Sequence, residues 1–437
     1  MVSSVCHEGL GESFTLQNDY EYMNSTTPAR FKLIFVNRYF APDQSATSQI
    51  LTDLAGGLTR RGFNVHVVCS AQLYDNPDAR LERTEQLAGV TVHRIATTRF
   101  GRHRLAGRAI DYASFYLSCA LKLLKLLTRG DIVVAKTDPP LVSLVCALAV
   151  KMRGAALINW QQDVFPEIAS LLGSNPLPRW LDALLRRWRD ASLRAAKMNV
   201  VIGSRMLQYF VRAGIPAAQL CVIENWADAR QVVPKLPSAS ALRARLGLLD
   251  RFVVGYSGNL GRAHEFETIL GAAKALESEP VFAFLIIGGG AKIPAFKRAV
   301  AECGLNNVRF LPYQPRDALD DSLAAADVHM ASLLPSLEGF IVPSKFYGIL
   351  AAGRPVVFVG DPDGELSRII LAAQCGLVVN VAACDELATQ LCRLRATPNA
   401  CAAMGRRARE LLSEKYDTRA AIEKWSAMLL GLKEQSA

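Results

Sequence analysis

The sequence predicts an α/β protein built from two Rossmann-like halves that face each other across a cleft. Short apolar runs alternate with helix-periodic stretches along most of the 437 residues, and strands that alternate with helices predict a parallel sheet covered on both faces. The alternation stops once, in a polar stretch that holds Pro234 and Pro237, and then begins again. We therefore expect two domains of about 200 residues each, joined by a linker near residue 235.

The first half begins with a strand, a helix and a second strand. Residues 31–37 form a short apolar run, residues 45–61 have helical periodicity and end at Gly62, and residues 64–69 are again strand-like. Glycine commonly follows the last turn of a helix. A second helix is predicted at 110–127, and the remaining strands expected in this half are 90–95, 131–135, 156–160 and 198–202.

The second half repeats this pattern. Its first predicted strand is 252–256, and helices dominate from about residue 385 to the end. We expect the last helix, from about 418 to 437, to pack back on the first half. The other strands expected here are 282–287, 308–311, 328–332, 355–359 and 376–379.

The ends of the domains follow from these elements. Residues 1–29 are polar and aperiodic and lack the segments of a secretory signal, so we expect a disordered extension. The first domain then covers residues 30–234 and the second covers 235–417. No uncharged apolar run reaches the ~18 residues that a membrane span needs.

The charge, cysteine and histidine content of the chain limits the kinds of ligand and cofactor that it would bind. The net charge is +10, which suits a nucleic acid, an anionic bilayer or a phosphorylated substrate. The ten cysteines form no CxxC pair, so we interpret them as free thiols in a reducing compartment. The six histidines lack metal-ligand spacing, and we expect neither a metal nor another cofactor.

The most informative stretch is Leu-Glu-Gly-Phe-Ile-Val-Pro-Ser-Lys at 337–345, which leads into a helical pattern ending in Gly-Arg-Pro. The start of a helix suits a phosphate, and Lys345 adds a full positive charge. Glu338 is placed to accept hydrogen bonds from sugar hydroxyls beside that phosphate. The pairing predicts a nucleotide-sugar site, and the alternative is a plain loop-to-helix turn with a solvated Lys345.

Two glycine-containing loops follow predicted strands of the second half. In the first, Gly258 and Gly261 would let the backbone approach a phosphate, and Arg262 could grip it bidentately. The spacing is not the GxGxxG pattern, which argues against a nicotinamide cofactor. In the second, Gly288 and Gly289 could flank the nucleotide. For both loops the alternative is an ordinary turn.

One acidic residue stands out in the first half. Asp163 follows the predicted strand 156–160, where a carboxylate could orient or deprotonate an acceptor hydroxyl. An equally good alternative is that Asp163 caps the next helix.

Two basic segments of the first half also carry apolar residues. Arg99, Arg102, His103, Arg104 and Arg108 precede the helix at 110–127, which carries Lys122 and Lys125. A second basic helix holds Trp180 and Trp188. These compositions suit an anionic membrane surface, although ordinary amphipathic core helices would share them. Nucleic acid is less favoured, because no helix-turn-helix, zinc or aromatic RNP pattern is present.

Taken together, the ordered motifs at 162–167, 223–226, 256–261 and 338–355 resemble those of family 4 glycosyltransferases of GT-B fold. Within that family they are similar to exopolysaccharide enzymes of the colanic-acid type. The resemblance covers about residues 31–430. It implies a retaining transfer from a nucleotide-diphospho-sugar without a bound metal.

The resemblance also implies roles for particular residues. Arg262 and Lys345 would hold the diphosphate, Glu338 would hold the donor sugar, and Asp163 would lie beside the acceptor. Further donor contacts are expected from Gly258, Asn259, Gly261, Gly288, Gly289, Gly339, Phe340 and Ser344.

Three departures from the family pattern are visible. Gly348 stands where many members have a second glutamate that binds the ribose. The first βα loop, 42–47, lacks the usual glycines, although the hydroxyls of Ser45 and Thr47 could donate hydrogen bonds instead. The usual basic partner beyond Arg262 is missing, and His264 or Lys345 would take its place.

The function expected from all this is transfer of a sugar from a UDP- or GDP-sugar to a lipid-linked saccharide in surface polysaccharide synthesis. The enzyme would be cytoplasmic and peripheral at the inner face of the cytoplasmic membrane. One alternative is a GT-B epimerase that converts the nucleotide sugar alone. Another, motivated by Gly348, is a non-catalytic nucleotide-sugar-binding subunit of an assembly complex.

Overall fold

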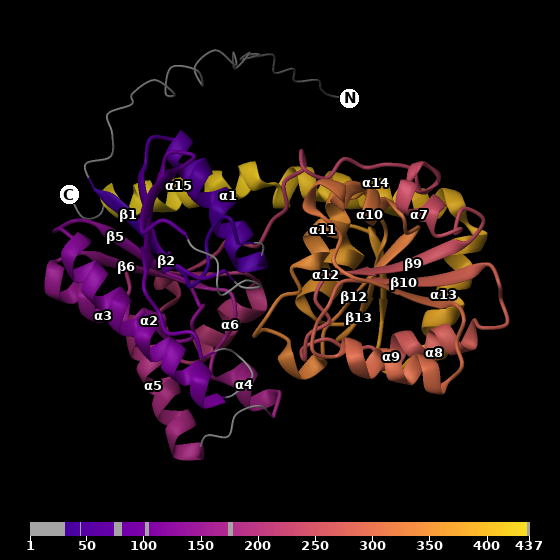
Figure 1. Ribbon diagram of the computed structural model, residues 1–437, viewed down its shortest axis with the longest axis horizontal. Helices are drawn as coiled ribbons and strands as arrows, with labels where there is room; N and C mark the ends of the chain where they lie inside the picture. The colour runs from indigo at the N-terminus through magenta and orange to yellow at the C-terminus, as the bar shows by residue number, and fades with distance from the viewer. Residues whose placement is uncertain (1–30, 44, 74–80, 101–104, 174–177, 435–437) are drawn as a thin grey trace, which may run out of the picture.

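The structure is a computed structural model that describes residues 31–43, 45–73, 81–100, 105–173 and 178–434. It consists of two α/β domains, each with a sheet between layers of helices (Figure 1). This architecture confirms the predicted fold class. The extension expected at residues 1–29 lies outside the described residues.

The first sheet has eight strands in the order β3-β4-β2-β1-β5-β6-β7-β8. All neighbours pair in parallel except β3 and β4, which form a hairpin. The strands are β1 (Lys32–Val36), β2 (Asn64–Ser70), β3 (Thr84–Leu87), β4 (Val90–Ile95), β5 (Ile132–Ala135), β6 (Ala156–Gln161), β7 (Met198–Val201) and β8 (Leu220–Val222).

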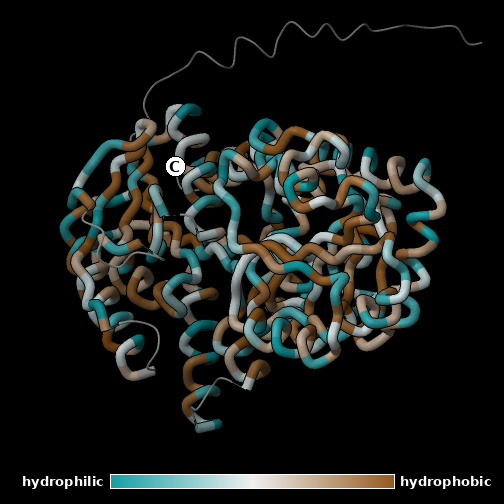
Figure 2. Tube along the Cα trace, turned by 45° about the vertical axis from the view of Figure 1, so that its right-hand side comes forward, coloured by the Kyte–Doolittle hydropathy of each residue, from teal (hydrophilic) through white to brown (hydrophobic). Residues whose placement is uncertain are grey.

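Alternation of side chains along the central strand explains the layers of this domain. Leu33 and Phe35 of β1 join the core under α1 (Ala46–Arg60), while Ile34 and Val36 join the core under α2 (Leu105–Leu126). Hydrophobic residues accordingly follow the strands in the interior (Figure 2). The other helices are α3 (Val142–Arg153), α4 (Glu167–Leu171), α5 (Arg179–Ala195) and α6 (Ser204–Arg212).

The second sheet has six parallel strands in the order β11-β10-β9-β12-β13-β14. They are β9 (Phe252–Ser257), β10 (Phe282–Ile287), β11 (Val308–Leu311), β12 (Val328–Ser332), β13 (Val356–Val359) and β14 (Gly376–Val379). Its helices are α7 (Ala241–Arg245), α8 (Glu267–Ala275), α9 (Ile293–Glu302), α10 (Leu319–Ala324), α11 (Lys345–Ala351), α12 (Glu365–Ala372), α13 (Cys384–Ala396) and α14 (Pro398–Leu411).

The predicted strands are all observed, within a residue or two at their ends. The sequence did not reveal β3 and β8. The strand β3 is polar (Thr-Glu-Gln-Leu), and its hairpin turns at Ala88 and Gly89, both with positive φ. The strand β8 is only three residues long. Neither offers enough apolar periodicity to be recognised.

The last helix, α15 (Thr418–Glu434), returns to the first domain. It follows a π-helical turn at Leu412–Tyr416 and lies against α1. The indole of Trp425 is fully buried, with its ring centroid 4.9 Å from that of Trp160 and 6.3 Å from that of Phe35. The chain therefore crosses between the domains twice, once after β8 and once before α15.

The two domains are also in direct contact at the carboxyl ends of their strands. The Val164 N–H donates to the Phe340 carbonyl over 3.0 Å. The Glu365 carboxylate accepts from the N–H groups of Ser204 and Arg205, which open α6. A buried core that includes Phe210 and residues of the second domain is continuous across this contact.

The return of α15 yields a prediction about stability. Trp425→Ala should lower the free energy of unfolding by about 3–5 kcal/mol, because it empties a large buried volume against two aromatic rings. Urea unfolding would measure this loss. The matched control is Glu423→Ala, which removes an exposed ion pair with Arg61 and should change the stability by about 1 kcal/mol or less. Equal effects of the two substitutions would contradict the packing role.

Candidate active site

The two glycine-containing loops of the second domain lie directly against each other. The Gly258 N–H donates to the Ile287 carbonyl over 2.9 Å, and the Leu260 N–H donates to the Gly289 carbonyl over 2.7 Å. Gly288 has a φ of +129°, and a Cβ there would lie 2.2 Å from the Gly258 carbonyl oxygen. The second loop therefore needs its glycine so that it can support the first loop at close range.

Lys345 reaches this first loop from the start of α11. Its Nζ lies 3.0 Å from His264 Nε2, 3.4 Å from the Asn259 carbonyl and 4.8 Å from the centre of the Tyr256 ring. None of these groups is an anion. Burial lowers the pKa of Lys345 to about 7, and none of the described residues places an anion beside its ammonium to oppose this shift.

His264 holds this lysine as a neutral group. Its Nδ1 lies 2.5 Å from the Ser332 carbonyl, which can only accept, so Nδ1 carries the proton and Nε2 accepts from Lys345. Burial, with the nearby Lys345, lowers the pKa of His264 to about 3. Of the two residues expected to take the place of the missing basic partner, His264 therefore orients Lys345 without adding charge, which leaves Lys345 for that role.

Arg262 projects from the same loop. Its side chain is exposed, and it makes no hydrogen bond or ion pair with any residue that the structure describes. Asn259 lies between Gly258 and Gly261 and directs its carbonyl at Lys345. Ser344, just before Lys345, is exposed at the start of α11. The structure thus places one unpaired guanidinium and one oriented ammonium along a single loop.

One of the two carboxylate oxygens of Glu338 accepts a hydrogen bond within the protein. Its Oε1 accepts from the Glu365 N–H over 2.6 Å, while Oε2 has no hydrogen bond among the described residues. Burial raises the pKa of Glu338. The carboxylate is therefore anchored at the start of α12 with one oxygen left to accept from a ligand.

The role expected for Phe340 needs correction. Its N–H donates to the Leu337 carbonyl over 3.0 Å, and its carbonyl accepts from Val164. Its ring packs edge-on against Tyr209, with the centroids 4.9 Å apart. Both backbone groups are thus used within the protein, and Phe340 joins the domains instead of binding a sugar. Gly339 beside it has a φ of +80°, which allows the turn.

The structure also shows the surroundings of the two other departures from the family pattern, Gly348 and the first βα loop. A Cβ added at Gly348 would meet no atom within 4 Å, so no neighbouring group fills the space that a glutamate side chain would enter there. In the first βα loop the Ser45 hydroxyl donates to Asp43, and the Thr47 carbonyl accepts from Lys136. The Ser45 hydroxyl is therefore already used within the loop, contrary to the expectation that it would serve a ligand.

Asp163 lies at the carboxyl end of β6, across the domain contact. It does not cap a helix, because α4 begins after Pro166 without a side-chain cap. Burial raises the pKa of Asp163 to about 6; the charge of Asp138 adds to this rise and that of Lys136 opposes it. Asp163 makes no side-chain hydrogen bond among the described residues, which leaves its carboxyl group available.

Two further charged residues near Asp163, Lys136 and Asp138, were not among those predicted for the site. Both follow β5, the strand next to β6 in the sheet. The Lys136 ammonium lies 4.4 Å from the centre of the Trp160 ring, and burial lowers its pKa to about 7. The sequence signal was Lys-Thr-Asp-Pro-Pro at 136–140, polar residues directly after an apolar strand. Asp163, Asp138 and Lys136 form a second group of titratable side chains, opposite the glycine loops.

The motif residues beside Asp163 have structural roles. Buried Gln162 donates to the Asn225 side chain over 2.9 Å, and the Trp226 ring stacks on Trp160 with centroids 5.9 Å apart. These contacts fix the loop that carries Asp163. They explain why the motifs at 162–167 and 223–226 occur together.

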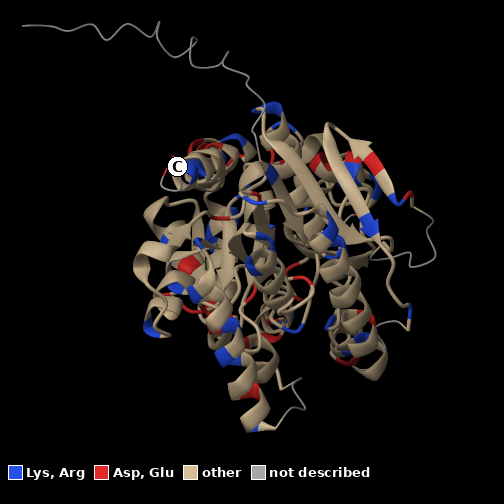
Figure 3. Ribbon diagram, turned by 90° about the vertical axis from the view of Figure 1, so that its left-hand side faces the viewer, with Lys and Arg blue, Asp and Glu red and all other residues tan. Residues whose placement is uncertain are grey.

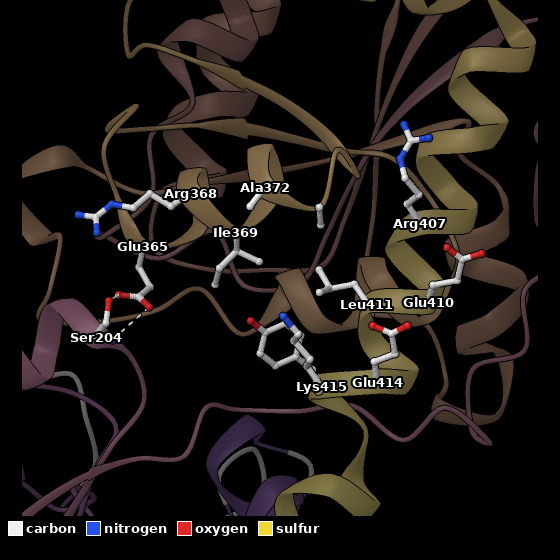
Figure 4. A pocket seen from close by; sticks show the side chains of 12 residues that line it. Ser204, Glu365, Arg368, Ile369, Ala372, Arg407, Glu410, Leu411, Glu414 and Lys415 are labelled. Carbon is white, nitrogen blue, oxygen red and sulfur yellow. Dashed lines mark hydrogen bonds between the residues drawn. The ribbon is translucent and has the colours of Figure 1, made fainter. Parts of the chain in front are cut away.

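A pocket of about 520 Å³ opens between α12, α14 and the start of α6 (Figure 4). Its wall carries charges of both signs, including Arg368, Arg407 and Glu410. Of the residues predicted for the site, none lines this pocket. Among the described residues, no group of three or more histidine, cysteine, aspartate or glutamate side chains is arranged to hold a metal ion.

Both domains match known family models. Residues 46–226 match the model described as a glycosyl transferase 4-like domain, and residues 239–411 match that of glycosyl transferases group 1. A Pseudomonas aeruginosa protein named as the glycosyltransferase WbjE is 26% identical over 411 residues, which cover 93% of this chain and 99% of that protein. The Escherichia coli K12 protein named as the colanic acid biosynthesis glycosyl transferase WcaI is 28% identical over 254 residues, or 56% of this chain and 60% of that protein.

Solved structures share the arrangement of the two domains. Sucrose-phosphate synthase from Thermosynechococcus elongatus superposes with a TM-score of 0.75 at 17% identity, over 93% of this chain and 100% of that one. Anabaena HepE in complex with UDP-glucose gives 0.70 at 17% identity, over 92% and 99% of the two chains. At these identities the likeness concerns the fold alone.

The raised pKa of Asp163 predicts a stability effect with a definite sign. Because its pKa is higher in the folded than in the unfolded chain, the ionised carboxylate destabilises the fold above about pH 6. Asp163→Asn should therefore raise the stability by up to about 3 kcal/mol at pH 8, and this gain should vanish as the pH falls towards 4. Melting temperatures between pH 4 and 8 would show it.

The matched control for this prediction is Asp250→Asn, which changes an exposed aspartate of the second domain. It should leave the pH dependence of the melting temperature unchanged. A lower melting temperature for Asp163→Asn at pH 8 would show instead that the carboxylate serves the fold.

Proposed function

This chain belongs to the family 4 glycosyltransferases of GT-B fold, and from that premise we propose that it transfers a sugar from a nucleotide-diphospho-sugar to a lipid-linked saccharide. The observation that carries the proposal is Lys345, held by neutral His264 beside the unpaired Arg262. The relation to WcaI, named for colanic acid biosynthesis, supports a role in surface polysaccharide synthesis. A cytoplasmic enzyme at the inner membrane face would fit that role.

On the donor side, the diphosphate would accept hydrogen bonds from Lys345 and Arg262. Negative charge grows on this group as the bond to the sugar breaks, and cations already in place stabilise that charge without reorganisation. We propose that these side chains do so without a metal ion. The free Oε2 of Glu338 would accept from a sugar hydroxyl. The donor would be a UDP- or GDP-sugar, and HepE, of the same fold, binds UDP-glucose.

On the acceptor side, Asp163 would orient the attacking hydroxyl and take its proton. A carboxyl group with a pKa of about 6 is ionised at neutral pH, yet basic enough to accept a proton as the new bond forms. Lys136 would stabilise the ionised form. Family membership supports retention of the anomeric configuration.

The first domain presents an apolar and basic surface, which we call the α2–α3–α5 face. Helix α3 contacts both α2 and α5, and each of the three helices exposes large apolar side chains. Figure 3 shows lysine and arginine positions along these helices. The exposed apolar residues are Leu117 and Leu121 of α2, Leu148 and Met152 of α3, and Trp180 and Trp188 of α5.

We propose that the α2–α3–α5 face rests on an anionic bilayer. Leu148 is 61% exposed and lies three residues before Lys151, and Trp180 is 68% exposed and directly follows Arg179. Apolar anchors flanked by cations are typical of interfacial binding. No helix of the described chain is long and apolar enough to cross a membrane. The residues Arg102, His103 and Arg104 lie outside the described residues.

The donor site gives the principal test of the function. Lys345→Ala and Arg262→Ala should each lower sugar transfer at least about 100-fold, because each removes a cation from the leaving diphosphate. Melting-temperature shifts with UDP, GDP and ADP and their sugar conjugates would first identify the donor, since a ligand of the folded state raises the melting temperature. Both variants should keep the wild-type melting temperature without ligand.

A matched control is Lys274→Ala, which removes an exposed lysine at the far end of α8 and should leave transfer unchanged. Wild-type turnover in both Lys345→Ala and Arg262→Ala would refute the assignment of the donor site.

The membrane proposal predicts selective loss of vesicle binding. The double variant Leu148→Ser/Trp180→Ser should bind vesicles of phosphatidylcholine and phosphatidylglycerol at least about tenfold more weakly, because two apolar side chains no longer enter the bilayer. Co-sedimentation would measure the binding. Leu371→Ser, at an exposed leucine of the second domain, is the control and should bind as the wild type does. Failure of the wild type to prefer anionic vesicles would contradict the proposal.

A further inference from the structure

Arg38 is a buried arginine at the carboxyl end of β1, in the same row of loops as Asp163. Its side chain is only 5% exposed. Its backbone N–H donates to the Asp138 carbonyl over 2.7 Å, and its carbonyl accepts from the Ser70 N–H over 2.9 Å. The loop that carries Arg38 is therefore fixed from both sides.

The guanidinium of Arg38 has two aromatic rings as neighbours, and it makes no side-chain hydrogen bond with any residue that the structure describes. It lies 5.3 Å from the centre of the Tyr39 ring and 5.1 Å from that of Tyr112. Its buried Nε has no hydrogen-bond partner, and within the described chain the guanidinium forms no ion pair. The carboxylate of the neighbouring Asp138 instead interacts with Lys136 and Asp163.

The other buried arginines of the described chain have the carboxylate partner that Arg38 lacks. Each of them forms an ion pair with a carboxylate. The pairs are Arg94 with Glu85, Arg189 with Glu167, and Arg243 with Asp327. Among the buried arginines of the described chain, Arg38 is thus the exception that forms no ion pair. Burial alone does not explain this, because the other three are buried to a similar degree.

A buried charge without a partner is strongly destabilising, and the attraction of two aromatic rings offsets only part of that cost. An arrangement of this kind is stabilised when a ligand supplies the missing anion. A guanidinium presents its donors in a planar fork that matches two oxygens of a phosphate or a carboxylate. We propose that Arg38 binds an anionic group of the acceptor, an inference that rests on the proposed function.

The topology sets the distance between this group and the reacting hydroxyl. Arg38 follows β1 and Asp163 follows β6, and β5 lies between these two strands. Two strand spacings amount to about 10 Å. A sugar that presents a hydroxyl to Asp163 can therefore present an anionic substituent on its far side to Arg38.

The source of the anion is either the phosphate that links the acceptor sugar to its lipid or the carboxylate of an acidic sugar. Helix α2 bears on this choice, because it carries both Tyr112, which covers Arg38, and the exposed Leu117 of the α2–α3–α5 face. A lipid held at that face would bring its phosphate towards the Arg38 end of the site. We therefore expect the phosphate to be the stronger ligand.

The experiment isolates Arg38 from the donor site. The full chain with Lys345→Ala and Arg262→Ala, in which the donor cations are absent, is titrated calorimetrically with inorganic pyrophosphate and with glucuronate. One of these anions should bind, and adding Arg38→Met should weaken that binding at least tenfold. Stronger binding of pyrophosphate assigns a phosphate source, and stronger binding of glucuronate assigns a carboxylate source.

Two further variants test whether the binding depends on the guanidinium of Arg38. Arg38→Lys keeps the charge but loses the fork, and it should bind the anion with intermediate affinity. The matched control Arg212→Gln removes an exposed arginine at the end of α6, on the opposite edge of the sheet, and should bind as its parent does.

The melting temperature separates a ligand site from a structural role. Arg38→Met should melt at or above the wild-type temperature, because it removes an unpaired buried charge while keeping an apolar stem. A large fall in melting temperature in both Arg38→Met and Arg38→Lys would overturn the proposal. Absence of anion binding in the parent, or binding that Arg38→Met leaves unchanged, would also overturn it. None of these outcomes depends on sugar transfer. Failure of the Arg38 proposal can therefore be told apart from failure of the proposed function.

Discussion

Contact between the carboxyl edges of the two sheets is the constraint on which the site depends, and Glu365 makes much of that contact. Its backbone N–H binds the Glu338 carboxylate, while its own carboxylate binds the first two N–H groups of α6 in the other domain. One residue thus ties the predicted sugar-binding carboxylate to the domain that carries Asp163.

Both domains hold, at the carboxyl ends of their strands, ionisable groups whose charge is incompletely balanced by the described residues. On one side burial lowers the pKa of Lys345, and His264 binds it as a neutral acceptor. On the other side burial raises the pKa of Asp163. The two shifts have opposite directions and the same cause, which is loss of water without a full counter-charge. On the proposed function, a diphosphate beside Lys345 and an acceptor hydroxyl beside Asp163 would supply the partner that each group lacks, and the binding energy gained there would serve catalysis.

The fold could be predicted from the sequence because buried parallel strands leave a strong local signal, and every strand predicted this way is present. Asp163 could be singled out because it directly follows one of these strands. Lys136, Asp138 and Arg38 occupy equivalent places after their own strands, yet nothing local shows that β1, β5 and β6 are neighbours. That order is a property of the sheet. The structural use of Phe340 was equally hidden, because its partners Val164 and Tyr209 come from the other domain.

Strand order then gives the site a direction. Along one edge of the first sheet, the guanidinium of Arg38 follows β1, Lys136 and Asp138 follow β5, and the carboxyl group of Asp163 follows β6. Helix α2 covers the guanidinium end of this row and continues into the apolar and basic face of the domain. The carboxyl end meets the second domain, where Val164 binds Phe340. On the proposed function, an acceptor anchored at the membrane side would enter at Arg38 and present its hydroxyl at Asp163, towards the loops that would hold the donor. Because the strand order sets the places of these residues, that direction of entry would follow from the topology of the sheet.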